Sequence, residues 1–344
     1  MTLKRTPLFL HHEDAGAKIV DFVGWEMPIQ YTSIISEHKA VREKVGVFDV
    51  SHMGQIFVSG KDTADFLSYV TTWDMKRQSI GDCRYCHILD DKGSIIDDTI
   101  VYTLDDDFYM LVPNASTVVE VYEWLKSHSS RFDVKIDNKS GDYYCLALQG
   151  PEAPRLLGQH LNTSVGPFQL VTIGDTIVSG TGYTGEKGCE IIGPIDEVIQ
   201  HWEALIDMGA VPVGLGARDT LRLEKGYLLS GQDFNGSQST LETGYAWVID
   251  WNHDFIGKKA LEVIRKNSYK SLKGILIEER GIVRPGYPIY CKGERISNLT
   301  SGTLSPSLRR GIGLAYLDLD FGTSISVEVR GNHLNGRVVR TPFI

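Results

Sequence analysis

Two consecutive acidic residues, Asp97 and Asp98, lie in a stretch whose other side chains are mostly apolar. The stretch from Gly93 to Tyr102 is rich in β-branched residues and lies between two turn signals, so it predicts a β-strand. Asp is disfavoured inside a strand, and an ionised carboxylate in apolar surroundings is costly unless a partner compensates its charge. A carboxylate held there can be a functional group or a structural one, and the stretch alone does not decide between them.

The two acids lie on opposite faces of this predicted strand. Successive side chains of a strand point to opposite faces, so Asp98 shares a face with Ile96 and Ile100. Asp97 lies on the other face with Thr99. Because both neighbours of Asp98 on its face are apolar, we expect Asp98 to occupy the drier pocket. The stretch by itself is equally compatible with a structural carboxylate paired with an arginine, or with a β-bulge that turns both acids outward.

The composition is that of an ordinary soluble protein. The 344 residues carry 42% hydrophobic and 23% charged side chains and a net charge of −9, enough for two or three domains. The acidic balance argues against a general nucleic-acid or anionic-membrane binder, because such proteins carry a basic excess. No apolar run reaches the length of a membrane span, and no secretory signal is recognisable. We expect a cytoplasmic protein that binds neither nucleic acid nor membranes.

The five cysteines are odd in number and scattered, as expected for a reducing compartment. Only Cys83 and Cys86 have the spacing of metal ligands, and a structural zinc site normally needs a second matching pair. We interpret both as strand residues on opposite faces and predict no metal site. A general base at His52 would need a nearby nucleophile, so we interpret this histidine as structural, with its hydrogen bonds satisfied.

The order of the predicted elements is that of an α+β protein. Apolar spacing predicts a first helix that begins at Ser33 or Ser36 and runs to residue 45. It predicts four further helices, over residues 62–70, 115–127, 153–160 and 196–208. Strands are predicted over residues 47–54, 55–58, 85–113 (a meander), 143–149, 175–179 and 189–194. From Leu272 onward, short strands and glycine turns predict an all-β barrel or sandwich domain.

Three glycines, Gly180, Gly182 and Gly185, formally match the dinucleotide-binding pattern G-x-G-x-x-G. That interpretation requires a helix next, whereas the following residues, 189–194, are typical of a strand. We reject it and expect a tight loop in which the backbone lies close to a ligand or to another chain segment.

Two further charged residues stand out. Glu190 is, like Asp98, an acid between apolar strand residues. Arg218 lies where a glycine-rich loop turns into a helix that Gly226 ends. A guanidinium held there can grip a carboxylate of a ligand, or pair with a fold acid such as Asp98 or Glu190.

Motifs along nearly the whole chain, in order, resemble the glycine cleavage system T-protein family, the aminomethyltransferases. They are Asp21-Phe-x-Gly-Trp-Glu-Met-Pro, Gly46-Val-Phe-Asp-Val-Ser-His-Met-Gly, Ile96-Asp-Asp, Gly182-Tyr-Thr-Gly-Glu, Gly214-Leu-Gly-Ala-Arg-Asp-Thr-Leu-Arg-Leu-Glu, Gly231-Gln-Asp, Phe255-Ile-Gly-Lys and Thr300-Ser-Gly-x-x-Ser-Pro-Ser. The resemblance implies a three-domain cloverleaf around a central folate channel. Its domains would be residues 1–52 with 141–260, residues 53–140, and an all-β domain over 272–344.

The resemblance also implies a reaction. Tetrahydrofolate would accept a methylene unit from the aminomethyl group on the lipoyl arm of H-protein, with release of ammonia. It assigns the catalytic role to Asp98, and contacts with the pterin to Glu190 and Arg218. Further folate-site positions carried over are Met53, Tyr85, Asn114, Tyr183 and Trp247. For the two tyrosines and the tryptophan, core packing is a close competitor.

Departures from the family pattern bear on the donor and on the folate tail. Gly180 stands where the family often has Arg, and Lys187 and Cys189 replace acidic and aromatic residues. Arg309 and Arg310 replace a Gly-Lys pattern, and relatives often continue beyond the last three residues. A folate-dependent demethylase with a small methylated donor is therefore an alternative. A non-catalytic folate-binding iron–sulfur assembly factor is another, although the cysteine of its Lys-Gly-Cys-Tyr motif is missing after Lys225.

Overall fold

The structure, a computed structural model, describes residues 2–344 and divides into two compact units. The first unit comprises the chain up to Ile88 together with Asp97–Arg218 and Asp250–Phe255. The second comprises Leu89–Ile96, Asp219–Ile249 and Ile256–Ile344. None of the helices in the described residues is both long and apolar enough to span a membrane.

The first unit begins with a small sheet and then builds a six-stranded one. The small sheet has the order β1 (Lys4–Arg5), β3 (Trp25–Gln30), β2 (Lys18–Phe22) and is accompanied by α1 (Phe9–Asp14). The six-stranded sheet has the order β11 (Leu170–Ile173), β12 (Thr176–Ser179), β13 (Gly188–Pro194), β10 (Tyr143–Gln149), β4 (Gly46–Asp49), β14 (Val211–Pro212). Its pairs are antiparallel except β14 with β4.

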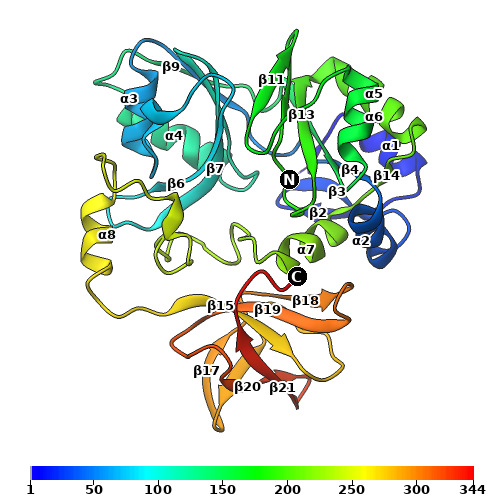
Figure 1. Cartoon of the computed structure of the whole chain (residues 1–344), viewed down its shortest axis with the longest axis vertical. Coiled ribbons are helices and arrows are strands. Elements are labelled where there is room, and N and C mark those ends of the chain that lie inside the picture. The colour runs from blue at the N-terminus through cyan, green and yellow to red at the C-terminus, as the bar shows by residue number, and fades with distance from the viewer. Residues whose placement is uncertain (1) are drawn as a thin grey trace. The chain divides into compact units, whose positions relative to one another are not determined.

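Helices α5 (Ala153–Leu161) and α6 (Val198–Asp207) pack on one face of the six-stranded sheet (Figure 1). The core on this face includes Leu146 and Leu148 of β10 and Cys189 and Ile191 of β13. Because side chains alternate along a strand, Glu190 points to the opposite face of the sheet. Helix α2 (Ile34–Glu43) is capped by Ser33, and the 3-10 helix η2 (Ile195–Glu197) leads into α6.

The glycine-rich segment between β12 and β13 is the tight loop expected from the sequence. A Cβ on Gly180 would lie 1.9 Å from the carbonyl oxygen of Gly166, and one on Gly182 would lie 2.1 Å from Gln149 Oε1. Backbone atoms therefore exclude a side chain at Gly180, whereas a side chain at Gly182 would require Gln149 to move. Strand β13 follows the loop, which confirms the rejection of a dinucleotide-binding turn.

A five-stranded sheet in the first unit carries both aspartates. Its order is β6 (Cys83–Leu89), β7 (Ile95–Asp105), β8 (Phe108–Val112), β5 (Ile56–Ser59), β9 (Lys135–Asn138). Helices α3 (Thr63–Val70) and α4 (Val118–His128) and the 3-10 helix η1 (Met75–Arg77) complete this part of the chain. Cys83 and Cys86 are buried residues of β6, as the sequence predicts.

The second unit contains a seven-stranded sheet, drawn in yellow to red in Figure 1. Its order is β17 (Glu294–Asn298), β16 (Pro288–Cys291), β20 (Ser324–Val329), β21 (Asn332–Val339), β15 (Ser271–Ile277), β19 (Arg310–Leu317), β18 (Ser301–Ser305). Aliphatic side chains of these strands form its core, among them Ile275, Ile289 and Val327. The unit also holds the 3-10 helix η3 (Ala246–Val248) and α8 (Lys258–Ile264).

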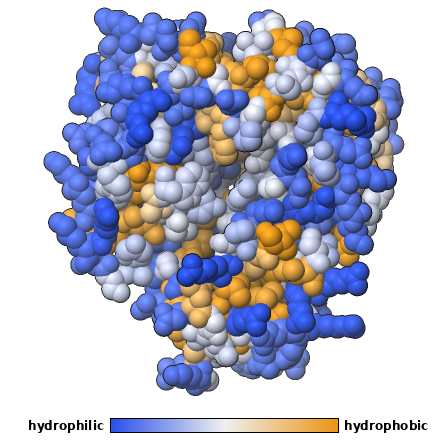
Figure 2. All heavy atoms as spheres, in the orientation of Figure 1, coloured by the Kyte–Doolittle hydropathy of each residue, from blue (hydrophilic) through white to orange (hydrophobic). Residues whose placement is uncertain are grey.

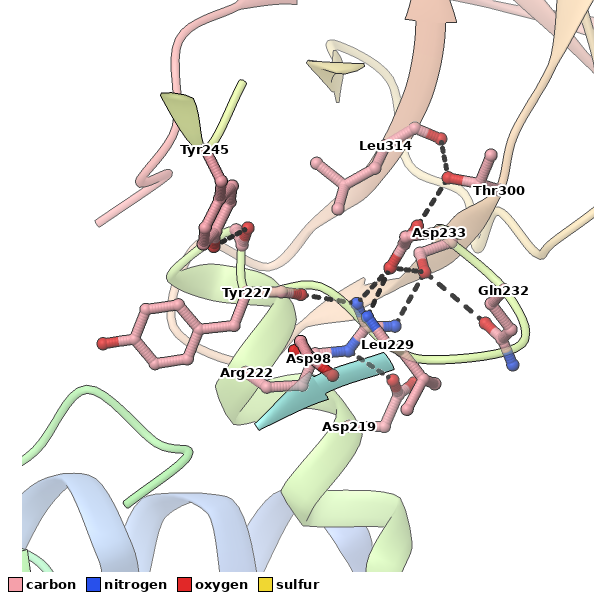
Figure 3. A network of polar contacts seen from close by, with 12 residues as sticks. Asp98, Asp219, Arg222, Tyr227, Leu229, Gln232, Asp233, Tyr245, Thr300 and Leu314 are labelled. Carbon is pink, nitrogen blue, oxygen red and sulfur yellow. Dashed lines mark hydrogen bonds and ion pairs between the residues drawn. The ribbon is translucent and has the colours of Figure 1, made fainter. Parts of the chain in front are cut away.

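Helix α7 (Leu215–Glu224) starts in the first unit, and its residues from Asp219 onward belong to the second. There Arg222, with 1% of its side chain exposed, is the centre of a polar network (Figure 3). Its Nη1 donates to Asp233 Oδ2 and to the Tyr227 carbonyl, both at 2.8 Å. Its Nη2 donates to Ser301 Oγ at 2.7 Å, and its Nε to Asp219 Oδ1 at 2.9 Å. The buried charge is thus compensated on all sides.

The serines of the Thr300-to-Ser307 motif bind the charges at the end of α7. Besides Ser301, the Ser305 hydroxyl donates to Glu224 Oε1 at 2.5 Å. The Ser307 backbone N–H and hydroxyl donate to the same carboxylate at 3.1 and 3.0 Å. Glu224 is fully buried, so these donors satisfy a carboxylate that water cannot reach.

Figure 2 shows hydrophilic residues over most of the visible face, with apolar patches between them. Among the described residues, the exposed large apolar side chains come from many separate elements, for example Leu10, Val119, Val263 and Phe321. Scattered exposure of this kind is normal for a folded protein and needs no special explanation.

The α+β fold class and the all-β C-terminal region are confirmed. Strand β10 has the predicted bounds, and α3, α5 and α6 begin and end within two residues of the predicted ones. The extended segment expected over 47–54 is shorter, because β4 ends at Asp49. The cloverleaf arrangement and the three-domain division stay predictions.

Two buried histidines of the first unit are held neutral. His52 is 4% exposed and His87 is fully buried. Burial, followed by the nearby Arg218, lowers the pKa of His52 to about 4, although Asp49 opposes the shift. Burial lowers the pKa of His87 to about 3. His52 Nδ1 has no hydrogen-bond partner among residues 2–344, so the expectation that this histidine is fully satisfied is wrong.

We expect Asp233→Asn to destabilise the second unit by about 3–5 kcal/mol, because it removes the buried carboxylate partner of Arg222 and leaves only the partly exposed Asp219. Urea denaturation combined with amide hydrogen exchange in β18 measures the loss. Breaking the half-exposed pair Arg337–Glu278 by Arg337→Gln serves as the control, with an expected change of about 0–1 kcal/mol. Equal losses in both variants would contradict a structural role for the Arg222 network.

We expect the two buried histidines, His52 and His87, to lower stability as the pH falls from 7 to 5. Below the usual histidine pKa, the unfolded chain binds protons at positions 52 and 87 that the folded chain refuses. With the pKa of His52 at about 4, that histidine alone removes about 2 kcal/mol over this range. Urea denaturation at pH 7 and pH 5 measures this loss of unfolding free energy. In His52→Gln the loss between the two pH values should be smaller than in the wild type by about that amount. An unchanged pH dependence in the variant would contradict this interpretation.

Candidate active site

Asp98 is held by two hydrogen-bond donors on the five-stranded sheet. The Tyr85 hydroxyl, on the neighbouring strand β6, donates to Asp98 Oδ2 at 2.7 Å. The side-chain amide of Asn114, which follows β8, donates to Asp98 Oδ1 at 2.6 Å. Hydrogen bonds of this length to a charged acceptor are strong and fix the orientation of the carboxylate. Asp98 itself is partly exposed, whereas its neighbour Asp97 is fully buried.

Asp97, and not Asp98, is the fully buried acid of the pair. The expectation of a drier pocket for Asp98 is therefore wrong. Residues 95, 97, 99 and 101 of β7 form its buried face, whereas 96, 98 and 100 are partly exposed. The apolar neighbours of Asp98 did not reveal which face of the strand packs inward. Burial, and then the adjacent charge of Asp98, raises the pKa of Asp97.

Glu190 of β13 is oriented from one side only. Its Oε2 accepts hydrogen bonds from Thr181 Oγ1 at 2.5 Å and from the Tyr102 hydroxyl at 3.4 Å. The Thr181 hydroxyl is also 2.7 Å from Ser179 Oγ. The other oxygen, Oε1, accepts no hydrogen bond from any described residue. A carboxylate fixed through one oxygen is well suited to accept N–H groups of a ligand with the other.

Arg218, in the first turn of α7, lies with its guanidinium carbon 4.6 Å from the centre of the Tyr183 ring. Its Nη1 is buried and has no hydrogen-bond partner within residues 2–344. Burial lowers the pKa of Arg218, and the charge of Glu190 opposes that shift. A buried donor without an acceptor is rare in native structures, so this one indicates that a ligand or water completes the site.

The start of α7 is positioned by a buried carboxylate, Glu37 of α2. Its Oε1 accepts the backbone N–H groups of Tyr31 and Thr32, and its Oε2 accepts that of Gly214 at 2.9 Å. A Cβ on Gly214 would lie 2.5 Å from the backbone of Ile29, so only glycine allows this approach. These contacts place the loop that leads into Arg218.

Strand β7 joins the two groups of polar residues. Asp98 and Tyr102 lie on the same face of β7, about 13 Å apart along the strand, and Tyr102 contacts Glu190 of the six-stranded sheet. Met53 is also close to Asn114, because the N–H of the following residue, Gly54, donates to the carbonyl of Pro113. Both groups belong to the first unit.

The structure thus brings seven of the eight candidate residues into one unit: Met53, Tyr85, Asp98, Asn114, Tyr183, Glu190 and Arg218. Trp247 lies in η3 of the second unit, where its side chain is 55% exposed and its ring centre lies 5.7 Å from that of Tyr245. The functional roles of all eight stay predictions.

Sequence reasoning missed two residues that orient Glu190. Tyr102 shares a strand face with Asp98, and Thr181 lies inside the glycine-rich loop, but neither position signals its partner. The described residues contain no group of three or more His, Cys, Asp or Glu side chains arranged to hold a metal ion.

Comparisons with known proteins identify the family of the chain. Residues 8–253 match the family described as the GCVT N-terminal domain, and residues 270–344 match the glycine cleavage T-protein C-terminal barrel domain. An aminomethyltransferase of Halothermothrix orenii is 42% identical over 99% of this chain and 100% of its own length. One from Thermosipho melanesiensis is 40% identical over 99% of this chain and 97% of its own.

A crystal structure of the glycine cleavage system aminomethyltransferase T from Bartonella henselae has the same fold. It superimposes with a TM-score of 0.95 at 33% identity and covers 99% of this chain and 98% of its own. Two family matches that together cover most of the chain, and full-length relatives at about two-fifths identity, lead to one conclusion. The chain belongs to the glycine cleavage T-protein family and is an aminomethyltransferase.

Proposed function

We propose that this aminomethyltransferase transfers a methylene unit from the aminomethyl group on the lipoyl arm of H-protein to tetrahydrofolate, with release of ammonia. Family membership supports the reaction class. One observation supports the assignment of the site. The same unit holds a fixed, partly exposed carboxylate, Asp98, and a second group with polar atoms that lack hydrogen-bond partners. That second group is Glu190 with Arg218.

The second group fits a reduced pterin. A pterin presents an amino group and ring N–H donors at one edge and a carbonyl oxygen nearby. Glu190 Oε1 is available to accept N–H groups, and Arg218 Nη1 needs an acceptor. The Tyr183 ring lies against the Arg218 guanidinium and adds an apolar, polarisable surface. The available donors and acceptors are therefore complementary to those of the pterin edge.

The chemistry requires a fixed negative charge. The aminomethyl group must lose ammonia, which leaves an electron-poor methylene carbon, and folate N5 must attack that carbon. The bond from that carbon to the lipoyl sulfur must then break, so that the products are 5,10-methylenetetrahydrofolate, ammonia and dihydrolipoyl H-protein. We propose that the Asp98 carboxylate orients N5, stabilises the developing positive charge and receives the proton that N5 loses. Preorganised electrostatic stabilisation is often worth about 3 kcal/mol per group. Proton transfer contributes about 10²–10⁴-fold.

We also propose the three-domain division given by the resemblance and a cytoplasmic location. The relatives at about two-fifths identity carry the aminomethyltransferase name, which favours H-protein over a small methylated donor and over a non-catalytic role. Met53, in the same unit as Asp98 and Glu190, completes the proposed folate site.

We expect Asp98→Asn to lower kcat by at least about 10²-fold while tetrahydrofolate still binds, because the amide keeps the shape but cannot carry the charge or accept the proton. Ammonia release with aminomethylated H-protein as donor measures kcat, and equilibrium fluorescence titration measures folate binding. Asp107→Asn, at the exposed hairpin after β7, is the control and should behave as wild type. Near-normal turnover of Asp98→Asn would make Asp98 a structural residue, and turnover with methylamine in place of H-protein would favour the demethylase.

We expect Glu190→Gln to weaken tetrahydrofolate binding by about 10- to 100-fold, because a charged acceptor of N–H groups is replaced by a neutral one. At saturating folate, kcat should change by less than about threefold, since the carboxylate binds ground state and transition state alike. Steady-state kinetics with varied folate separates the two effects. A fall in kcat at unchanged folate affinity would place Glu190 in the chemical step instead.

A further inference from the structure

Asn114 bridges the two aspartates of β7. Its Nδ2 lies 2.8 Å from Asp97 Oδ1, 2.6 Å from Asp98 Oδ1 and 3.2 Å from the Asp98 carbonyl oxygen. All three neighbours are acceptors, so the amide nitrogen and not the amide oxygen faces them. Both amide hydrogens are therefore committed to the aspartate pair.

The position of Asn114 follows from the β7–β8 register. Ile100 pairs with Val112, so continuation of the antiparallel ladder by two residues places Asn114 opposite Asp98. The chain leaves the ladder there, since the Thr117 N–H donates to the carbonyl of Asn114 in a turn that precedes α4. This turn lets one side chain reach acids that point to opposite faces of β7.

Asp97 binds both the side chain and the backbone of Asn114. Besides the side-chain contact, Asp97 Oδ2 accepts the backbone N–H of Asn114 at 2.9 Å. Two parallel contacts between one carboxylate and one asparagine fix the backbone and the χ angles of that asparagine together. Asp97 is fully buried and Asp98 is partly exposed, so only Asp98 can meet a ligand. The buried acid thus acts on the exposed one through the amide between them.

We propose that Asn114, locked in place by Asp97, is a positioning residue that fixes the Asp98 carboxylate and does not bind folate itself. This inference rests on the proposed function, in which Asp98 serves the attack by folate N5. It assigns a purpose to both acids of the pair: one faces the reaction, and the other anchors the donor that holds it. A rigid support of this kind matters because a misplacement of about 1 Å lowers rates by about 10²-fold.

A double-mutant cycle tests the inference. Asn114→Ala in the wild-type background should lower kcat by about 10- to 100-fold and change the folate Kd by less than about threefold. In the Asp98→Asn background the same substitution should change kcat by less than about threefold, because the group that Asn114 positions has already lost its function. Asn138→Ala, at the exposed end of β9, is the matched control and should leave both values unchanged.

Asp97→Asn provides a second variant if Asn114→Ala does not fold. This substitution keeps the size of the side chain but replaces one acceptor oxygen with an N–H₂ group, which cannot accept a hydrogen bond from Asn114. It should therefore lower kcat as Asn114→Ala does, with folate affinity retained. Independent, multiplying losses in the cycle, or a loss of folate affinity at unchanged kcat, would overturn the inference while the proposed function stands. Wild-type turnover of Asp98→Asn alone would overturn both.

Discussion

The site depends on how one partly exposed carboxylate is held in the middle of a β-strand. An ionised Asp at such a position is stable only where donors surround it, and Asp98 receives them from Tyr85 on one side and from Asn114 on the other. The five-stranded sheet supplies both donors, because β6 and β8 are the neighbours of β7. The arrangement fixes the orientation of the carboxylate, which is what a group that stabilises charge in a reaction requires.

The second group of polar residues follows a related principle. Glu190 is fixed by Thr181 and Tyr102 through a single oxygen, and Arg218 is partly buried with an unsatisfied Nη1. Unsatisfied buried groups cost stability, so the retention of this nitrogen beside Glu190 indicates a ligand. The contrast with Arg222 is instructive. That guanidinium is also buried, but its carboxylate, hydroxyl and carbonyl partners are all present, which identifies it as a structural residue.

The sequence allowed correct prediction of most elements, for physical reasons that can be named. Periodicity and turn residues defined β10 and α5 closely, and the strand after the glycine-rich loop excluded a dinucleotide turn. The facing argument at Asp98 failed because alternation tells which residues share a face, but not which face is covered. The partners of the acids could not be foreseen either. Asn114 is 17 residues from Asp97, and Tyr102 is 88 residues from Glu190, so only the folded sheets bring them together.

The central claim is that a tetrahydrofolate molecule binds with its N5 at Asp98. A crystal structure of this protein with tetrahydrofolate tests it most directly. The account predicts N5 within hydrogen-bonding distance of the Asp98 carboxylate, about 2.6–3.2 Å, with the pterin amino group on Glu190 and the Asn114 amide still turned toward the two aspartates. A pterin bound elsewhere, or one whose ring displaces Asn114 from Asp97 while Asp98 faces water, would contradict it.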